Sequence, residues 1–294
     1  MSKYFDETLK AQQQKVRVSE PGPVDVVSLL DAIKQEDPTV TEVAEEVAPV
    51  IQRIREIRIP KLDRSLTVVA ADDTSRSACF VEAYHSLRTR LMKVHDTGVH
   101  SIMLTSSVTL EGKTLTALNL ALVCAQLNDH RVLLVDGDLR SRGLTRLLQI
   151  ESETGLSEIL SGATAATEAV FVTGQSNLHV LAAGTSCRQT ADLFAGPRWS
   201  EFMEWAKQTY SIVLVDGPPI HLTADAELIS AGCDGTLLVI RARSTPRELA
   251  LSCADRLDKN KFLGLILNGV SEREGGYDDY YYGTPSGTTT NKKV

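Results

Sequence analysis

The chain contains six short runs of apolar residues that predict buried strands. Most of these runs are continuously aliphatic rather than alternating, which is the pattern of a strand with both faces covered. Amphipathic patterns with helical spacing lie between most of them. This order of elements predicts a doubly wound α/β fold with a mainly parallel sheet. The expected strands cover residues 101–104, 131–135, 178–182, 211–215, 236–241 and 262–267, and the expected longer helices cover residues 78–94, 115–127, 199–209 and 246–259.

The N-terminal part of the chain has a different pattern. Residues 1–23 are polar, and residues 24–59 hold two helical patterns. Pro38 separates the two, Pro60 closes the second, and Pro49 is expected to kink it. This part is either a simple helical appendage or a docking element for a partner.

These patterns predict three regions. Residues 1–65 form a polar and helical N-terminal extension, and residues 66–270 form the α/β domain. Residues 271–294 have one aliphatic residue, the terminal Val294, so they cannot bury enough apolar area to fold alone. We interpret them as a flexible, disordered tail.

Composition narrows the class of protein. Hydrophobic residues make up 43% of the chain and charged residues 23%, as in soluble globular proteins, and the net charge of -7 argues against general affinity for nucleic acid. The five cysteines form no C-x-x-C pair and the six histidines have no metal-ligand spacing, so we expect no zinc site. No apolar run approaches the roughly 20 residues of a membrane span, and no secretory signal is apparent. We therefore expect a cytoplasmic protein.

The junction after the first predicted strand has the layout of a phosphate-binding loop. A polar loop leads into Gly112-Lys113-Thr114, where a helix begins. Backbone N–H groups and the helix dipole favour an anion at such a position. Lys113 would reach the β- and γ-phosphates, and the Thr114 hydroxyl would ligate Mg²⁺. Because the first glycine of the usual pattern is replaced by Ser107, the motif alone is equally compatible with an ordinary helix start.

Two later strands end in carboxylates. Asp136 and Asp138 follow the run at 131–135, and Asp216 follows the run at 211–215. Strand-ending turns commonly use Asp-Gly, so each could be merely structural. However, the carboxyl ends of parallel strands meet at one edge of a sheet, where ligands bind. Together with the loop, the carboxylates predict a nucleotide site.

Four of the chain's seven tyrosines lie in the C-terminal tail, although disordered segments are normally poor in aromatic residues. Either they pack back onto the domain or a partner, or their hydroxyls are substrates. A tyrosine tethered to a nucleotide site is at high effective concentration for phosphoryl transfer. The four residues are Tyr277, Tyr280, Tyr281 and Tyr282.

With these motifs the chain resembles the bacterial tyrosine kinases of capsule and exopolysaccharide synthesis, over about residues 66–283. That family has a phosphate loop without a strict first glycine, two acidic strand ends and a C-terminal tyrosine cluster. The matching stretches are residues 105–114, Asp136-Gly137-Asp138-Leu139-Arg140, the glycine-bracketed residues 155–162, Asp216-Gly217-Pro218-Pro219 and Leu267-Asn268-Gly269.

The resemblance implies a MinD/ParA-like P-loop fold and an ATP- and Mg²⁺-dependent autokinase that phosphorylates its tyrosine cluster and regulates polysaccharide polymerisation and export. Lys113 would neutralise the phosphates, Thr114, Asp136 and Asp216 would hold the metal, and Asp138 would orient or deprotonate the tyrosine. Which of Asp136 and Asp138 is the base stays open. The residues expected to bind the cofactor are Glu111, Gly112, Lys113, Thr114, Leu115, Arg140 and Asn268.

The resemblance also implies a homo-oligomeric ring in which neighbouring subunits phosphorylate each other. The family's ring motif, Glu-x-x-Arg-x-x-Arg, is matched here by Glu82, His85 and Arg88, so its middle position departs. The phosphate loop departs as well, with Thr109-Leu110 where many relatives have Pro-Gly. The resemblance therefore supports a ring interface less directly than it supports the nucleotide site.

The partners implied are a transmembrane chain-length regulator (a polysaccharide co-polymerase) that activates the kinase, and a tyrosine phosphatase. The chain would then lie at the inner face of the membrane through that activator. Two alternatives remain. One is a partitioning or cell-division-site ATPase, which usually carries an extra lysine early in the loop, whereas none lies between Thr105 and Leu110 here. The other is a nucleotide-binding regulator without kinase activity.

Overall fold

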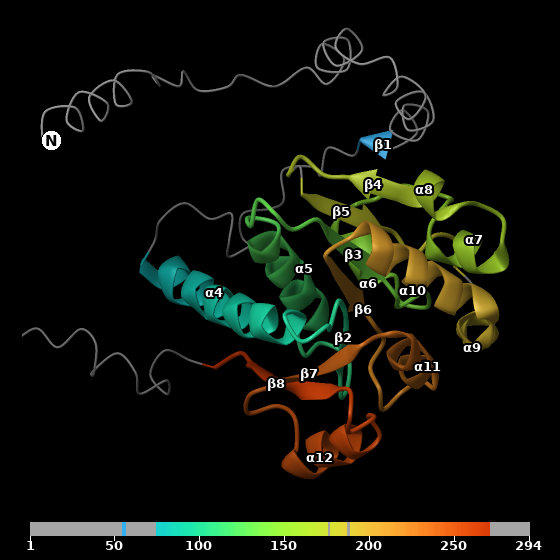
Figure 1. The fold of residues 1–294 in the computed structure, drawn as a ribbon. Coiled ribbons are helices and arrows are strands. Elements are labelled where there is room, and N and C mark those ends of the chain that lie inside the picture. The colour runs from blue at the N-terminus through green and yellow to red at the C-terminus, as the bar shows by residue number, and fades with distance from the viewer. Residues whose placement is uncertain (1–54, 57–74, 176, 187–188, 271–294) are drawn as a thin grey trace, which may run out of the picture. The chain divides into compact units, whose positions relative to one another are not determined.

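The computed structural model describes residues 55–56, 75–175, 177–186 and 189–270, which belong to one compact unit (Figure 1). The helical patterns expected in residues 24–59 and the tyrosine tail fall outside the described residues. So does the boundary expected at residue 65.

The unit is built on an eight-stranded sheet with the strand order β1-β4-β5-β3-β6-β2-β7-β8 (Figure 1). The six strands from β5 to β8 along this order run parallel, and all six were predicted from the sequence. β4 runs antiparallel to β5, and β1 pairs with β4 at the edge. The strands are β1 (Arg55–Glu56), β2 (Ser101–Ser106), β3 (Val132–Asp136), β4 (Val170–Val172), β5 (Leu178–Leu181), β6 (Ile212–Asp216), β7 (Gly235–Arg241) and β8 (Phe262–Asn268).

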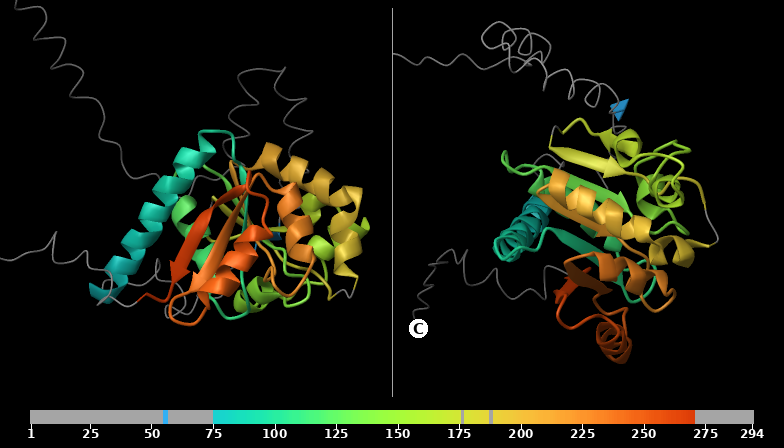
Figure 2. Two further views of the ribbon diagram at one scale, coloured as in Figure 1. Left: turned by 90° about the horizontal axis from the view of Figure 1, so that it is seen from below. Right: turned by 45° about the vertical axis from the view of Figure 1, so that its right-hand side comes forward.

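Helices lie on both sides of the sheet, as a doubly wound fold requires. In the left view of Figure 2, the teal helix α4 lies on one side of the red strands and the gold helix α10 on the other. The described helices are α4 (Ser75–His95), α5 (Lys113–Cys124), α6 (Gly143–Leu147), α7 (Leu156–Ser161), α8 (Ala166–Ala169), α9 (Thr190–Ala195), α10 (Pro197–Thr209), α11 (Asp225–Gly232) and α12 (Arg247–Asp255). Within the described part of the chain, none is long and apolar enough to cross a membrane.

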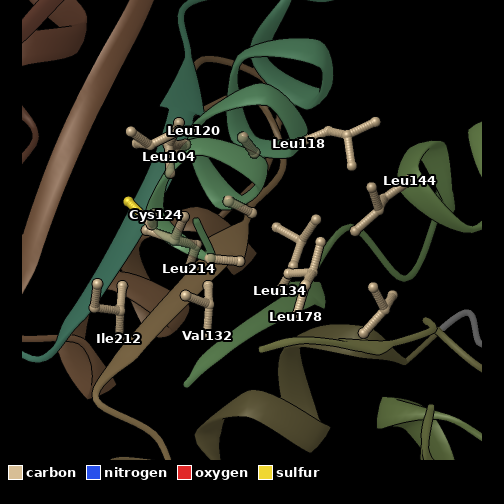
Figure 3. Close-up of a cluster of buried hydrophobic side chains, with 14 of the residues drawn as sticks. Leu104, Leu118, Leu120, Cys124, Val132, Leu134, Leu144, Leu178, Ile212 and Leu214 are labelled. Carbon is tan, nitrogen blue, oxygen red and sulfur yellow. The ribbon is translucent and has the colours of Figure 1, made fainter. Parts of the chain in front are cut away.

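Successive residues of the central strands enter opposite cores. Leu104 and Leu134 pack in the core under α4 and α5 (Figure 3), whereas Met103 and Leu133 pack against α10 and α11. Side chains of a strand alternate between its two faces, so a strand with both faces covered must be apolar throughout. This is why the strands appear in the sequence as continuous aliphatic runs.

The register of the central strands brings the acidic strand ends together. Asp136 at the end of β3 is directly opposite Asp216 at the end of β6, and Asp216 is in turn opposite Leu104 of β2. β2 leads into the loop before α5. One edge of the sheet therefore carries the loop and both carboxylates on three adjacent strands, as predicted.

Candidate nucleotide-binding site

The loop between β2 and α5 has a backbone that departs from ordinary conformations at two points. Leu110 has φ 65° and Gly112 has φ 89°, both in the left-handed region. A Cβ at Gly112 would collide with the Asn268 side chain, so this position needs glycine for space as well as conformation. Leu110 is 88% exposed, so its side chain contributes little to holding the loop.

Contacts from outside the loop hold it in this shape. The Glu111 carboxylate accepts the Val108 N–H at 2.9 Å and a hydrogen bond from the Thr245 hydroxyl. The Asn268 amide, at the end of β8, donates to the Glu111 carbonyl at 2.9 Å, and Arg241 of β7 donates to the Leu110 carbonyl at 3.1 Å. The loop is therefore fixed before any ligand binds.

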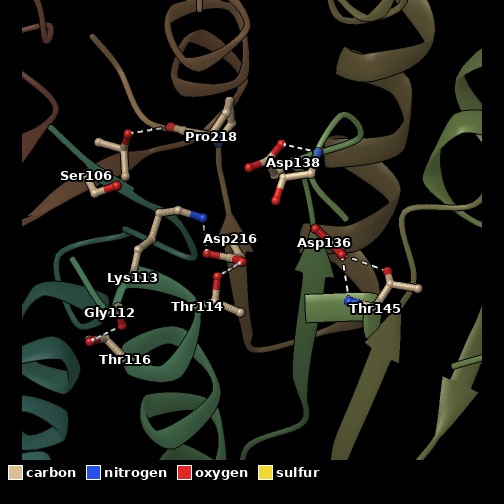
Figure 4. A network of polar contacts seen from close by, with 12 residues as sticks. Ser106, Gly112, Lys113, Thr114, Thr116, Asp136, Asp138, Thr145, Asp216 and Pro218 are labelled. Carbon is tan, nitrogen blue, oxygen red and sulfur yellow. Dashed lines mark hydrogen bonds and ion pairs between the residues drawn. The ribbon is translucent and has the colours of Figure 1, made fainter. Parts of the chain in front are cut away.

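Two residues after this loop converge on one carboxylate. The Lys113 ammonium lies 2.6 Å from Asp216 Oδ1, and the Thr114 hydroxyl donates to Asp216 Oδ2 at 2.8 Å (Figure 4). Asp216 is fully buried, and burial raises its pKa while the Lys113 charge acts in the opposite direction. The Lys113 ammonium thus compensates the buried negative charge of Asp216 beside the loop.

Asp136 is held on one side only. Its Oδ2 accepts two hydrogen bonds of 2.7 Å, from the Thr145 backbone N–H and the Thr145 hydroxyl. Its Oδ1 is buried and has no hydrogen-bond partner among the described residues. Burial, and next the nearby Asp216 charge, raise the pKa of Asp136 to about 7. An unpaired buried oxygen of this kind is suited to a cation or a water that the protein alone does not supply.

Asp138 lies at the rim of the same site (Figure 4). It is 7% exposed, and its Oδ1 accepts the Ser141 N–H at 2.9 Å. The charge of Asp138 also raises the pKa of Asp216, so the two carboxylates are close enough to interact. The turn that follows therefore holds Asp138 on the site while leaving its second oxygen to other partners.

This donor set fits a magnesium–nucleotide complex. Mg²⁺ is usually held by one or two carboxylates together with hydroxyl, phosphate and water oxygens. Asp216, Thr114 and the unpaired oxygen of Asp136 offer that combination. No group of three or more His, Cys, Asp or Glu side chains in the described part of the chain is arranged to hold a metal. Any divalent ion here would take its remaining ligands from phosphate and water.

Two predicted cofactor residues make structural contacts. The Arg140 guanidinium donates to Asp225 Oδ2 at 2.9 Å, and the Thr190 hydroxyl donates to the same oxygen at 2.6 Å. The Glu111 carboxylate is engaged inside the loop, as described above. The cofactor roles of Arg140 and Glu111 stay predictions. At Glu111, the backbone N–H rather than the carboxylate is the group that could bind an anion.

Sequence reasoning missed several residues that support the site. Thr145, Asp225 and Thr245 each bind a predicted site residue, and Thr190 binds Asp225, yet none of the four belongs to a motif. Thr145 lies nine residues after Asp136, so predicting their contact would have required a specific model of the turn between them. No local signal in the sequence marks these contacts.

The residues of the expected ring motif lie on α4. Glu82 is exposed, whereas His85 is half-buried and its Nε2 has no hydrogen-bond partner within the described structure. Arg88 donates to the Val123 carbonyl near the end of α5 at 2.9 Å. The Arg88 guanidinium is thus used inside the subunit, which leaves Glu82 as the member of the motif most open to a neighbour.

No protein-family model matches the chain. Curated relatives do. The chain is 34% identical over 207 residues to the tyrosine-protein kinase YwqD of Bacillus subtilis, covering 69% of this chain and 86% of that protein. It is 33% identical over 214 residues to the tyrosine-protein kinase etk of Escherichia coli, covering 71% of this chain. The chain spans 29% of the length of etk, so it corresponds to one part of that longer protein.

Solved structures agree with these relatives. The kinase domain of the Escherichia coli tyrosine kinase ETK superposes with a TM-score of 0.64 at 27% identity, covering 82% of this chain and 87% of that one. The chimerical protein CapA2B2 shares the fold, with a TM-score of 0.63 at 23% identity over 76% of this chain and 97% of that one. The cell division ATPase MinD of Pyrococcus furiosus matches less well, with a TM-score of 0.51 at 26% identity over 59% and 74% of the two chains.

Proposed function

This chain belongs to the family of bacterial tyrosine-protein kinases of capsule and exopolysaccharide synthesis, and we propose that its site transfers the γ-phosphoryl group of ATP to tyrosines in its own C-terminal segment. The acceptors proposed are Tyr277, Tyr280, Tyr281 and Tyr282.

The observation that carries this assignment is the convergence of Lys113 and Thr114 on Asp216. Lys113 and Thr114 begin α5, Asp216 ends the neighbouring strand β6, and the two polar groups lie 2.6 and 2.8 Å from its carboxylate oxygens. A lysine, a hydroxyl and a carboxylate at the start of a helix are the groups that cradle a magnesium-bound triphosphate. Lys113 is already desolvated, with a side chain 8% exposed, so its charge acts in a low dielectric.

We assign each residue one role in the transfer. Lys113 leaves Asp216 to neutralise the β- and γ-phosphates, while backbone N–H groups at the start of α5 bind the phosphate oxygens. Asp138 accepts a hydrogen bond from the tyrosine hydroxyl and takes its proton. The phenolate oxygen then forms a bond to the γ-phosphorus as the bond to the β-phosphate oxygen breaks, and ADP leaves.

We propose that Thr114, Asp136 and Asp216 hold Mg²⁺ with the nucleotide. The ion supplies charge neutralisation for the phosphate oxygens when it is bound. Asp136 is turned into the site by Thr145, which leaves one oxygen of its carboxylate free for this purpose.

The proposed assembly follows the family. We propose that the acceptor tail reaches the site of a neighbouring copy in a ring, that a transmembrane regulator of polysaccharide chain length activates the kinase from the inner face of the membrane, and that a tyrosine phosphatase reverses the modification. Residues 1–65 are the candidate docking segment for that regulator. Because Arg88 is engaged inside the subunit and His85 replaces the expected arginine, we expect the ring contacts of α4 to be weaker than the family motif implies.

Incubation of the purified full chain with Mg²⁺ and ATP tests this proposal. Mass spectrometry of its peptides should find phosphotyrosine in the tail. Lys113→Met should abolish the labelling, whereas Lys207→Met is the matched control, because Lys207 pairs with Asp234 at the opposite edge of the sheet. Labelling that survives in Lys113→Met would refute the site.

Two further outcomes separate the rival functions. Release of phosphate from ATP without any tyrosine labelling would indicate an ATPase of the MinD type. ATP binding with neither reaction, even with the activator present, would indicate a nucleotide-binding regulator.

A further inference from the structure

A hollow of about 410 Å³ adjoins the candidate site and has no part in the transfer described above. Arg142, just before α6, forms one wall, and Thr185 and Ser186, after β5, form another. Glu151, Ser152 and Glu153 complete the lining.

The sheet order places this hollow on the acceptor side of the site. β5 is paired with β3, whereas the phosphate loop follows β2, on the far side of β6. The hollow lies beside the turn that carries Asp138, because the backbone N–H of Arg142 donates to the backbone carbonyl of Asp138 at 2.6 Å. A tyrosine entering at Asp138 from the side opposite the nucleotide would therefore have its flanking residues over this hollow.

Arg142 is incompletely satisfied by the protein. Its Nε is buried, and no hydrogen-bond partner for it exists among the described residues. The two arginines near it differ in this respect, since Arg140 pairs with Asp225 and Arg146 donates to Ser141 Oγ at 3.3 Å. A desolvated guanidinium N–H without an acceptor is unfavourable, and a carboxylate or phosphate is the partner that its planar geometry suits best.

The walls of the hollow are fixed in advance. The Thr185 N–H donates to Glu158 Oε1 at 3.2 Å, and the Ser157 hydroxyl donates to Glu158 Oε2 at 2.9 Å. Arg142 is anchored through its own N–H, as described. A ligand of this hollow would therefore meet a preorganised surface, which reduces the entropy lost on binding.

The charge of the lining favours a carboxylate over a phosphate. Glu151 and Glu153 are exposed residues of the same hollow. The lining thus holds two carboxylates against the one guanidinium of Arg142, and the net repulsion on a phosphate dianion is about twice that on a single carboxylate. Of these two anions, the acidic side chain of a peptide is therefore the one that the lining opposes less, and Arg142 is the group that can hold it.

The tail carries such side chains two residues before two of its tyrosines. Successive side chains of an extended peptide point to opposite sides, so residues two positions apart share a side and lie about 6.6 Å apart along the chain. Asp278 stands two residues before Tyr280, and Asp279 two residues before Tyr281. Each of these tyrosines could thus be presented to Asp138 while the preceding aspartate enters the hollow.

We propose that this hollow is an acceptor-recognition subsite, in which Arg142 binds the carboxylate two residues before the acceptor tyrosine in the tail of a second copy. This inference rests on the proposed kinase function and deepens it by assigning a sequence preference. Tyr280 and Tyr281 are the favoured acceptors, whereas Tyr282 is preceded at that distance by Tyr280 and gains nothing from Arg142.

A donor and an acceptor form of the full chain test it. The donor has its four tail tyrosines replaced by phenylalanine, so that it cannot label itself, and the acceptor carries Lys113→Met. Arg142→Gln in the donor should raise the KM for the acceptor about tenfold, the size of one charge-assisted hydrogen bond, and leave the KM for ATP unchanged. An acceptor with Asp278→Asn and Asp279→Asn should show the same rise in KM with the unaltered donor. Combining this acceptor with the Arg142→Gln donor should raise the KM little further, because both variants remove the same contact.

Charge reversal distinguishes recognition from a structural role. A donor with Arg142→Glu should label an acceptor with Asp278→Lys and Asp279→Lys better than it labels the unaltered acceptor. Arg146→Gln is the matched control and should leave every KM unchanged, because Arg146 does not line the hollow. Equal acceptor KM values for the unaltered and Arg142→Gln donors would overturn the subsite while leaving the kinase function intact. No labelling by any donor would overturn both.

Discussion

Thr145 is a single residue on which three parts of the site depend. Its backbone N–H and hydroxyl both donate to Asp136, and its hydroxyl accepts the Ala183 N–H at 2.9 Å. It therefore joins β3, α6 and the loop after β5. The orientation of the Asp136 carboxylate, with one oxygen held and the other available, is a consequence of this one side chain.

Replacing Thr145 by valine keeps its shape and removes its hydroxyl. We expect a loss of about 2–3 kcal/mol in the free energy of unfolding, because a buried carboxylate oxygen and a buried N–H each lose a partner. Phosphorylation should also need more Mg²⁺, since Asp136 is then held by the backbone N–H of residue 145 alone. Denaturant unfolding and a magnesium titration of labelling measure the two effects.

Thr167→Val is the control for this substitution, because the Thr167 side chain makes no hydrogen bond within the described structure. It should change stability by less than about 0.5 kcal/mol. Unchanged magnesium dependence in Thr145→Val would contradict the role assigned to this residue.

Among the elements, the loop between β2 and α5 shows how a phosphate loop is held without its usual first glycine. Ser107 is fully buried at that position, and the chain turns instead at Leu110 and Gly112, both with positive φ. The turn is stabilised from β7 and β8 through Arg241 and Asn268. The shape of this element is thus set by its neighbours in the sheet.

Gly112→Ala should disrupt this loop. The added Cβ collides with Asn268, and the alanine must also adopt a left-handed backbone conformation. We therefore expect labelling to fall by more than about tenfold. The free energy of unfolding should fall by more than the roughly 1 kcal/mol that backbone strain alone costs. Gly98→Ala is the matched comparison, since Gly98 has φ 95° with no atom near its Cβ position. That variant should show the strain and keep its activity. Similar labelling in both variants would contradict the steric argument.

At the scale of the whole molecule, a buried histidine makes stability depend on pH. His179 of β5 is hydrogen-bonded through Nδ1 to the Tyr210 hydroxyl at 2.9 Å, and Arg131 lies 5.4 Å from the centre of the Tyr210 ring. Burial, and next the Arg131 charge, lower the pKa of His179 to about 4. The pair connects β5 to the residue that follows α10, so its protonation affects the fold rather than the site.

The sign of the pH effect follows from the lowered pKa. Below the unperturbed value of about 6.5 the unfolded chain binds a proton that the folded chain does not, so acidification from pH 6.5 to 4 favours unfolding. The stability contributed by neutral His179 is present above pH 6.5 and is lost through this window. His179→Gln should flatten this part of the curve of unfolding free energy against pH. His221→Gln, at an exposed histidine, should leave it unchanged.

The sequence by itself determined the six central strands and the edge of the sheet at which the loop and the carboxylates meet. Six central strands could be predicted because both faces of each are buried, which makes the runs continuously aliphatic. The convergence of Lys113, Asp136 and Asp216 could be predicted because parallel strands end at one edge of a sheet. The family could be inferred because these motifs combine with a tyrosine-rich tail.

Only the tertiary structure decided how these groups pair. Three of these features join separate segments of the chain: the edge pairing of the three-residue strand β4, the Thr145 contacts and the Arg88–Val123 hydrogen bond. A fourth, the unpaired Nε of Arg142, depends on burial. Such contacts leave no local pattern, because a hydrogen bond between two folded segments depends on where the segments lie and not on the residues beside them. The physical division is therefore between periodic burial, which a sequence records, and long-range polar pairing, which it does not.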